Sequence, residues 1–257
     1  MTSPEHGIRV FAIAAAAVVA ILWCSAGCAE AQHKAAPGTI QTIPGRGANA
    51  YLIKGEAGWI LVDTGMKGSA GGLLKAIGGL GIDARTINLI IITHAHPDHY
   101  GELARLKRLT GAKVMAHRYE SSFIESGRSS PIVAQTAKGR LINAVSPRWK
   151  LESAKVEIIV DDELDLSAFG VRGRVLSTPG HTRGSLSIVL EDGTVLVGDQ
   201  FRGGAGRLTL GMFYEDGRIL AASLKRIARY RPKILHMSHG ASTDLADLEA
   251  FIGTLEE

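Results

Sequence analysis

The chain has 257 residues, of which 46% are hydrophobic and 21% are charged, so a disordered or fibrous protein is excluded. Its 29 lysines and arginines barely exceed its 25 aspartates and glutamates, and this small, scattered excess argues against a nucleic-acid partner. Both cysteines, Cys24 and Cys28, lie near the N-terminus, so disulfides, thiolate nucleophiles and cysteine metal sites are excluded from the rest of the chain.

Residues 1–31 are predicted to be an export leader. An uncharged apolar stretch, residues 10–23, has the length and position of the hydrophobic part of a secretory signal peptide. The small residues Ala29 and Ala31 offer a cleavage site, whereas the four residues that end at Cys28 resemble a bacterial lipobox with an acylated cysteine. A third interpretation keeps the stretch as an uncleaved membrane anchor. All three predict an exported protein, periplasmic or anchored to a bacterial membrane, with residues 32–257 as one hydrolase domain.

The first half of this domain begins with short strands and continues with alternating helices and strands. The predicted elements are strands at 39–43, 50–54 and 59–62, a helix at 69–82, a strand at 87–93, a helix at 99–111 and a strand at 113–116. The run Ile87–Thr93 is continuously apolar, which is typical of a strand buried on both faces. Residues 119–150 are polar and are expected to be irregular.

The second half repeats the same order of elements. The predicted elements are strands at 156–160, 171–176, 186–190 and 194–197, a helix at 218–230, a strand at 233–237 and a helix at 243–255. Asp192-Gly193 predicts a hairpin between two of these strands. The sequence therefore predicts an α/β protein of two similar halves.

Three histidines and an aspartate directly follow the apolar strand, in the segment His94–His99 (HAHPDH). His94 and His96 are two residues apart, so in an extended segment their imidazoles point to the same side. Asp98 and His99 turn onto a new face at the start of the next helix, and this spacing suits two adjacent ions better than one. Neutral imidazoles and a carboxylate suit zinc, and also iron or manganese.

The chain resembles the metallo-β-lactamase superfamily from about residue 38 to its end. The resemblance rests on five motifs in order: Val62–Gly65 (VDTG), Thr93–His99 (THAHPDH), Thr178–Thr182 (TPGHT), Gly198-Asp199 and Ser238–Gly240 (SHG). It implies a four-layer αβ/βα sandwich of two packed mixed β-sheets flanked by helices.

The resemblance also implies a set of metal ligands for two divalent ions, zinc first, with iron or manganese as alternatives. These are His94, His96 and His181 for one ion, Asp98, His99 and His239 for the other, and Asp199 as the bridge. Asp63 would orient a ligand from behind. The pattern of strands agrees, because His181, Asp199 and His239 each follow a predicted strand. His117 and His236 are expected to be hydrogen-bonded structural residues.

Two adjacent ions predict hydrolysis by a bridging hydroxide, which attacks a carbonyl carbon or a phosphorus. Asp98 would be the catalytic residue that orients this nucleophile and takes its proton. Asp199 stands at a position where the best-known lactamase branch carries cysteine. An aspartate at this position resembles the glyoxalase II, lactonase and nuclease branches. Only 18 residues follow His239, which disfavours two-domain glyoxalase II, and export disfavours a nuclease. We therefore expect a small-molecule ester, lactone or thioester as substrate, with weak β-lactam turnover as an option.

Two segments are expected to wall the pocket, residues 119–150 and 201–214, and the second offers Arg202, Phe213 and Tyr214 as substrate contacts. Three alternatives remain open. A mononuclear iron oxidoreductase similar to persulfide dioxygenases would contain one iron and consume oxygen. A β-lactamase proper would hydrolyse nitrocefin, and a non-catalytic metal protein would hydrolyse nothing.

Overall fold

The computed structural model describes residues 36, 38–45, 47–146, 150–204 and 207–255. The predicted leader, residues 1–31 with Cys28, lies outside these residues. Within the described part of the chain, no helix is both long enough and apolar enough to cross a membrane.

The first sheet has six strands in the order β1-β2-β3-β4-β5-β6. Their bounds are β1 (Ile40–Ile43), β2 (Ala50–Lys54), β3 (Trp59–Val62), β4 (Ile87–Ile91), β5 (Lys113–His117) and β6 (Ile158–Val160). β1 to β3 pair antiparallel, and β3 to β6 pair parallel. Val62 pairs with Ile91, so the residues that follow β3 and β4 emerge side by side at one edge.

The second sheet has five strands in the order β13-β10-β9-β8-β7. Their bounds are β7 (Glu163–Asp165), β8 (Gly173–Ser177), β9 (Leu186–Leu190), β10 (Thr194–Leu196) and β13 (Ile234–His236). β9 and β10 form the predicted hairpin, and β10 and β13 run parallel with Leu196 beside His236. The residues after β10 and β13 therefore also emerge together.

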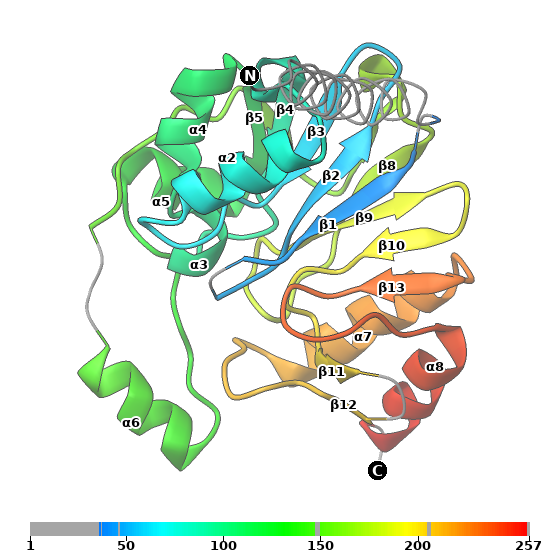
Figure 1. Ribbon diagram of the computed structural model, residues 1–257. Coiled ribbons are helices and arrows are strands. Elements are labelled where there is room, and N and C mark those ends of the chain that lie inside the picture. Colours follow the sequence, from blue (N-terminus) through cyan, green and yellow to red (C-terminus); the bar gives the residue numbers. More distant parts are fainter. Residues whose placement is uncertain (1–35, 37, 46, 147–149, 205–206, 256–257) are drawn as a thin grey trace, which may run out of the picture.

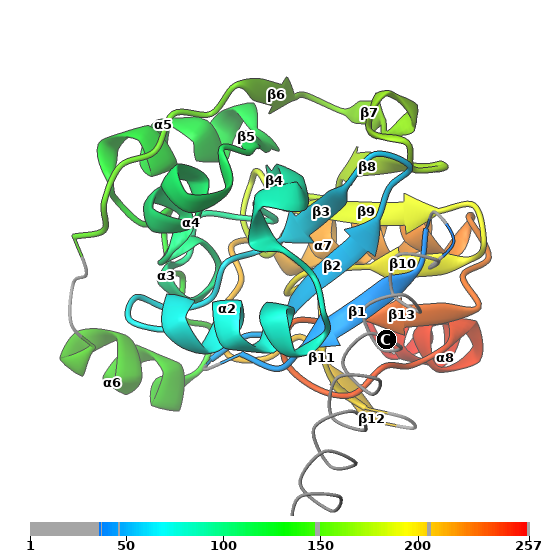
Figure 2. The ribbon, with the colours of Figure 1, turned by 45° about the horizontal axis from the view of Figure 1, so that its top comes forward.

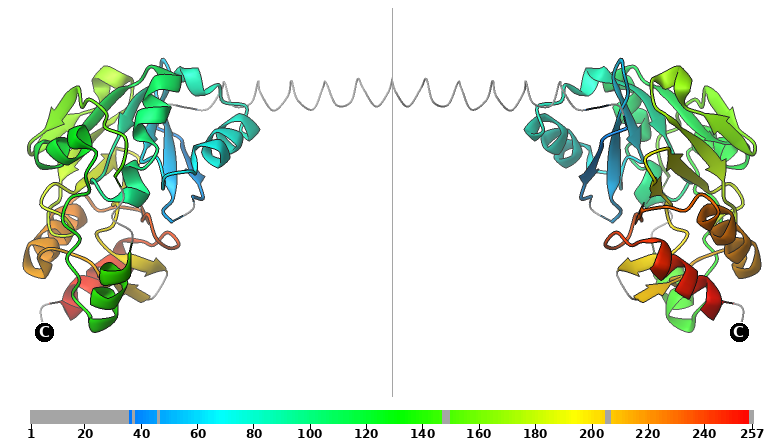
Figure 3. Two further views of the ribbon diagram at one scale, coloured as in Figure 1. Left: turned by 90° about the vertical axis from the view of Figure 1, so that its left-hand side faces the viewer. Right: turned by 90° about the vertical axis from the view of Figure 1, so that its right-hand side faces the viewer.

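Helices cover the outer faces of the two sheets (Figures 1 and 2). Those on the first sheet are α2 (Ala70–Gly79), α3 (Pro97–Tyr100), α4 (Leu103–Thr110) and α5 (Arg118–Ser126), and those on the second are α7 (Gly217–Ala228) and α8 (Leu245–Thr254). The side views of Figure 3 place α2 and α7 on opposite sides of the sheets. Helix α6 (Ala137–Val145) stands apart, and β11 (Arg202–Gly204) and β12 (Arg207–Thr209) form a separate small sheet.

Three apolar cores separate the four layers. In β2, Leu52 packs into the core beneath α2 to α5, whereas the next residue, Ile53, packs between the two sheets. Successive side chains of a strand point to opposite faces, so a strand buried on both faces is mainly apolar, as β4 is apart from its exposed Asn88. A third core lies between the second sheet and α7 with α8. The predicted αβ/βα sandwich is confirmed.

Two expectations about local structure were wrong. The segment 119–150 contains α5 and α6, because the side chains of His117 and Thr136 accept backbone N–H bonds at the helix starts and Gly127 ends α5 with φ +66°. The predicted helix 99–111 is two helices, α3 and α4. The segment 201–214 contains the β11–β12 hairpin.

Two expectations about isolated histidines are confirmed. The Nε2–H of His117 donates to the carbonyl of Asp161 over 3.1 Å. His236 Nδ1 lies 2.7 Å from the hydroxyl of Ser242.

Candidate metal centre

All seven side chains that the sequence suggested as ligands come together between the two sheets. They lie where strands end: residues 94–99 after β4, His181 after β8, Asp199 after β10 and His239 after β13. Because these ends face the same edge, segments up to 145 residues apart contribute to one cluster.

Three imidazoles form the first group, which we call the three-histidine subsite: His94, His96 and His181. His94 Nε2 lies 3.1 Å from His96 Nδ1, and His181 Nε2 lies 3.1 Å and 3.2 Å from these two atoms. Three corners of a tetrahedron with bonds of about 2.0–2.1 Å to zinc would lie about 3.3 Å apart. All three residues are buried, so the nitrogens face one another in a closely packed space shielded from bulk solvent.

Asp98, His99 and His239 form the second group, which we call the aspartate subsite. His239 Nε2 lies 3.4 Å from Asp98 Oδ2, and His99 Nε2 lies 3.8 Å from Asp98 Oδ1. Asp199 stands between the groups: its Oδ2 is 3.1 Å from His239 Nε2 and 3.9 Å from His181 Nε2. This is the position that a bridging carboxylate would need.

Two buried atoms of the cluster test whether it suits a metal ion. Among the described residues, His99 Nε2 and Asp199 Oδ1 make no hydrogen bond of normal geometry, although they lie 3.4 Å from each other as an ion pair. A buried polar atom left without a partner costs about 1–3 kcal/mol. A divalent cation would satisfy both, and a set of imidazole nitrogens and carboxylate oxygens suits zinc, iron or manganese. The residues present therefore fit metal ions.

The other ring nitrogen of each imidazole is held from outside the cluster. His96 Nε2–H donates to the carbonyl of Pro131 over 3.2 Å, and His181 Nδ1–H donates to that of Phe213 over 3.0 Å. Carbonyl oxygens only accept, so the proton sits on the outer nitrogen and the inner nitrogen presents its lone pair to the cluster. Both carbonyls come from the segments that the sequence placed around the pocket.

Asp63 orients two more of the candidate ligands, His99 directly and His94 through Thr93. Its Oδ2 accepts from His99 Nδ1–H and from the Thr93 hydroxyl, each over 2.8 Å, and its Oδ1 accepts from the Thr93 N–H over 2.8 Å. Having donated its only proton, the Thr93 hydroxyl accepts from His94 Nδ1–H over 3.1 Å. These bonds hold Asp63 in a left-handed conformation, φ +60°, which is costly for a residue other than glycine.

The two groups differ in charge in the metal-free protein. Burial lowers the pKa of His94, His96 and His181, the last to about 3, so the three-histidine subsite is neutral. Burial also opposes protonation of His99 and His239, but the neighbouring carboxylates outweigh it and raise both pKa values, that of His239 to about 9. The aspartate subsite is therefore ion-paired before metal enters.

The three residues expected to contact substrate have different surroundings. Phe213 contributes the carbonyl that holds His181. The Tyr214 side chain packs against the third core, beside Gly217. Arg202 is half-buried in β11, with its side chain over Gly211. Substrate contact by any of them stays a prediction.

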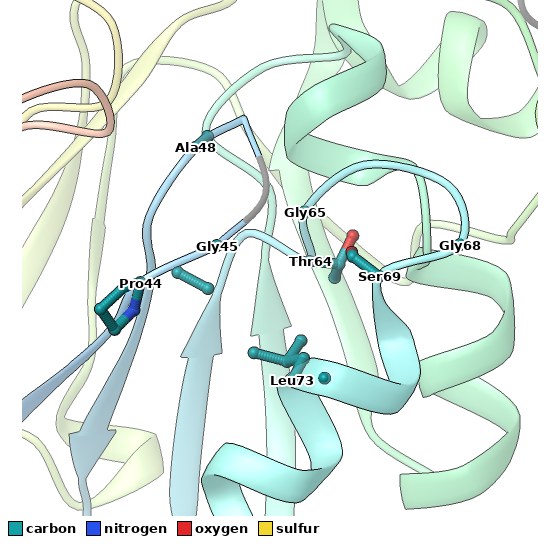
Figure 4. A pocket seen from close by; sticks show the side chains of 10 residues that line it. Pro44, Gly45, Ala48, Thr64, Gly65, Gly68, Ser69 and Leu73 are labelled. Carbon is teal, nitrogen blue, oxygen red and sulfur yellow. The ribbon is translucent and has the colours of Figure 1, made fainter.

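A small apolar cavity of about 240 Å³ lies between the turn after β1 and the start of α2, and none of the seven candidate ligands is among the residues that line it (Figure 4). Its walls come from the turn after β1, from Thr64 and Gly65 after β3, and from the start of α2 with Ser69 and Leu73. Thr64 donates to the carbonyl of His99 over 2.9 Å, which links the cavity wall to the aspartate subsite.

Two packed mixed sheets flanked by helices, with a histidine and aspartate cluster at one edge, define an αβ/βα protein with a candidate metal centre. The family model of the metallo-beta-lactamase superfamily matches residues 43–239, a region that contains the whole cluster. The chain belongs to this superfamily.

Individual relatives are distant. Uncharacterized protein YobT of Bacillus subtilis is 31% identical over 61% of this chain and 64% of its own length. Probable metallo-hydrolase YflN of the same organism is 27% identical over 58% of this chain and 59% of its own length. Hydroxyacylglutathione hydrolase of Ectopseudomonas mendocina is 29% identical over 56% of this chain and 43% of its own length. The chain thus spans less than two thirds of each of these relatives. The crystal structure of BLEG-1 B3 metallo-beta-lactamase superposes with a TM-score of 0.65 at 23% identity, covering 85% of this chain and all of that one.

Proposed function

We propose that this protein is a hydrolase that uses two divalent metal ions, zinc in the first place, to cleave an ester, lactone or thioester of a small molecule. The convergence of seven side chains with nitrogen or oxygen donors carries this proposal, and two of their buried atoms, His99 Nε2 and Asp199 Oδ1, lack a hydrogen bond among the described residues. Membership of a superfamily with a hydroxyacylglutathione hydrolase and a probable metallo-hydrolase supports it.

Metal ions held by these residues would supply an activated water and polarise the substrate oxygen. His94, His96 and His181 would hold one ion, Asp98, His99 and His239 the other, and Asp199 would hold both. Asp98 is the most accessible carboxylate of the cluster, with 26% of its side chain exposed against 10% for Asp199. It can therefore reach an attacking water, orient it through a hydrogen bond and take its proton.

One side of the centre is partly exposed and can admit a substrate. The tightly buried histidines leave Asp98 and His239 as the partly exposed side of the cluster, from which a substrate carbonyl would approach.

A panel of substrates tests this proposal. The zinc-loaded protein is offered activated esters, lactones, thioesters and nitrocefin, beside a His96→Ala variant. We expect turnover of at least one ester, lactone or thioester, and none by the variant. Preference for nitrocefin would indicate a β-lactamase. One iron per chain with oxygen uptake on a persulfide would indicate the dioxygenase alternative, and no turnover of any kind would contradict catalysis.

We further propose that residues 1–31 direct export, with the protein released into the periplasm or tethered through Cys28 or the apolar segment. Fractionation of cells that express the full chain tests this. Recovery in the soluble cytoplasm, with the leader intact, would contradict it. A Cys28→Ala variant that moves from membrane to soluble periplasm would indicate a lipid tether.

A further inference from the structure

Glu120 is a buried carboxylate that belongs to none of the five motifs. It lies on α5 and is fully shielded from solvent. A buried carboxylate is costly unless hydrogen bonds compensate it, and an apolar side chain would fill the same space at lower cost. Burial accordingly raises the pKa of Glu120, although its hydrogen bonds oppose the change. An ionisable side chain at this buried position therefore indicates a specific role for its carboxylate.

The bonds of its carboxylate supply that reason. Oε2 accepts from the N–H of Ala95 over 2.8 Å, and Ala95 lies between His94 and His96. Oε1 accepts from the hydroxyl of Thr182 over 2.8 Å, directly after His181, and from the N–H of Gly184 over 3.2 Å. One side chain therefore bonds both loops that carry the three-histidine subsite.

These two loops come from different layers. Ala95 follows β4 of the first sheet, whereas Thr182 and Gly184 join β8 and β9 of the second sheet. The contact is close: a Cβ on Gly184 would lie 2.6 Å from Glu120 Cγ, so no larger residue fits there. Glu120 thus spans the junction of the two sheets at the point where His181 must meet His94 and His96.

We propose that Glu120 is a positioning residue that clamps the loop of His94 and His96 to the loop of His181, and so sets the geometry of the three-histidine subsite. This inference rests on the proposed metal centre. The three donors named above all adjoin that subsite, whereas His99 is oriented by Asp63. Asp63 bonds His99 directly and reaches His94 only through the Thr93 hydroxyl, whereas Glu120 bonds only the loops of the three-histidine subsite. Loss of each carboxylate should therefore leave a different signature.

A Glu120→Gln variant keeps the size of the side chain and removes one acceptor. The amide must turn its NH₂ group either toward the N–H of Ala95 or toward that of Gly184, so one bond is replaced by a contact between two donors. Cobalt(II) alone is titrated into the metal-free full-length protein, and visible absorption follows the coordination of each ion. We expect the affinity of the three-histidine subsite to fall about 10–100-fold, the range for groups that orient metal ligands. The aspartate subsite should keep its affinity.

Glu125→Gln is the matched control, because Glu125 lies on the same helix, is exposed and accepts one backbone bond, from the N–H of Val156 over 3.0 Å. It should leave both affinities unchanged. If Glu120→Gln fails to fold, a second pair decides: Thr182→Val removes one bond of the clamp, and Thr182→Ser keeps it. Valine should weaken the three-histidine subsite, and serine should not.

Several results would overturn the clamp. One is a folded Glu120→Gln variant with a lower melting temperature but unchanged cobalt affinities, which would make the residue merely structural. An equal loss of cobalt affinity at both subsites in Glu120→Gln would also refute it. So would equal cobalt affinities of the three-histidine subsite in Thr182→Val and Thr182→Ser. A parent protein that binds two ions but hydrolyses nothing would refute the proposed function and leave the clamp standing. A parent that binds no cobalt would overturn both.

Discussion

Replacing Asp63 with asparagine should disconnect His99 from its anchor and leave the backbone in place. Asparagine tolerates the left-handed conformation that Asp63 adopts, φ +60°, better than most residues do. The amide cannot accept all three bonds that the carboxylate accepts from Thr93 and His99. If its NH₂ group faces His99, the ring must place its proton on Nε2, and the lone pair that points into the cluster is lost.

The geometry sets the expected magnitude. Each of the three bonds is 2.8 Å long and the carboxylate is buried. Loss of one bond to a charged group costs about 1.5–3 kcal/mol. In a protein of this size each kcal/mol shifts the melting temperature by about 2–4 °C, so the variant should melt roughly 3–12 °C lower. Metal affinity at the aspartate subsite should fall about 10–100-fold, or about 1.4–2.8 kcal/mol.

Competition with a chelator measures the affinities of both ions, and calorimetry measures the melting temperature. The control is Asp192→Asn, because Asp192 also accepts a backbone bond, from Thr194 over 2.8 Å, but lies exposed in the β9–β10 hairpin. It should change neither affinity. A folded Asp63→Asn variant that binds both ions as tightly as the parent would refute the role assigned to this network.

Four further predictions follow from the same geometry. His96→Ala should abolish turnover of every accepted substrate and lower bound metal; retained turnover would place the chemistry elsewhere. In the metal-free protein, the ion pairs of His239 should stabilise the fold below pH 6.5, and this stabilisation should disappear as the pH rises through about 9. The free energy of unfolding of His239→Gln and of the parent, each measured as a function of pH, tests this. Metal binding near pH 7 should release protons from His99 and His239, whose pKa values are raised, but none from the three-histidine subsite, whose pKa values are low. Calorimetry in buffers of different ionisation enthalpy counts the released protons. Chelation should lower the melting temperature by about 5–11 °C when metal had been present at 100 times its Kd, because that excess stabilises by about 2.7 kcal/mol.

The cluster could be predicted from the sequence because five short motifs resemble those of the superfamily, and the ligands that they imply all follow predicted strands. Strand ends are recognisable from the apolar run before them, as for Ile87–Ile91 before His94, and parallel strands bring their ends to one edge. The register of Val62 with Ile91 and of Leu196 with His236 then fixes where Asp63, Asp199 and His239 emerge.

The supports of the cluster could not be predicted in this way. Pro131 and Phe213 act through backbone carbonyls, which any residue could supply, so their identity carries no signal. Glu120 lies in a segment that was predicted to be irregular, and its role depends on tertiary contacts to loops 25 and 62 residues away. Thr93 and Thr182 stand next to ligands, and this adjacency is a signal that sequence reasoning could have used.

The most direct test of a two-metal centre is a crystal structure of the metal-loaded protein with anomalous scattering recorded at the zinc edge. Two peaks are expected, one among His94, His96 and His181 and one among Asp98, His99 and His239, with Asp199 in contact with both. A single peak, or peaks remote from these side chains, would contradict the account.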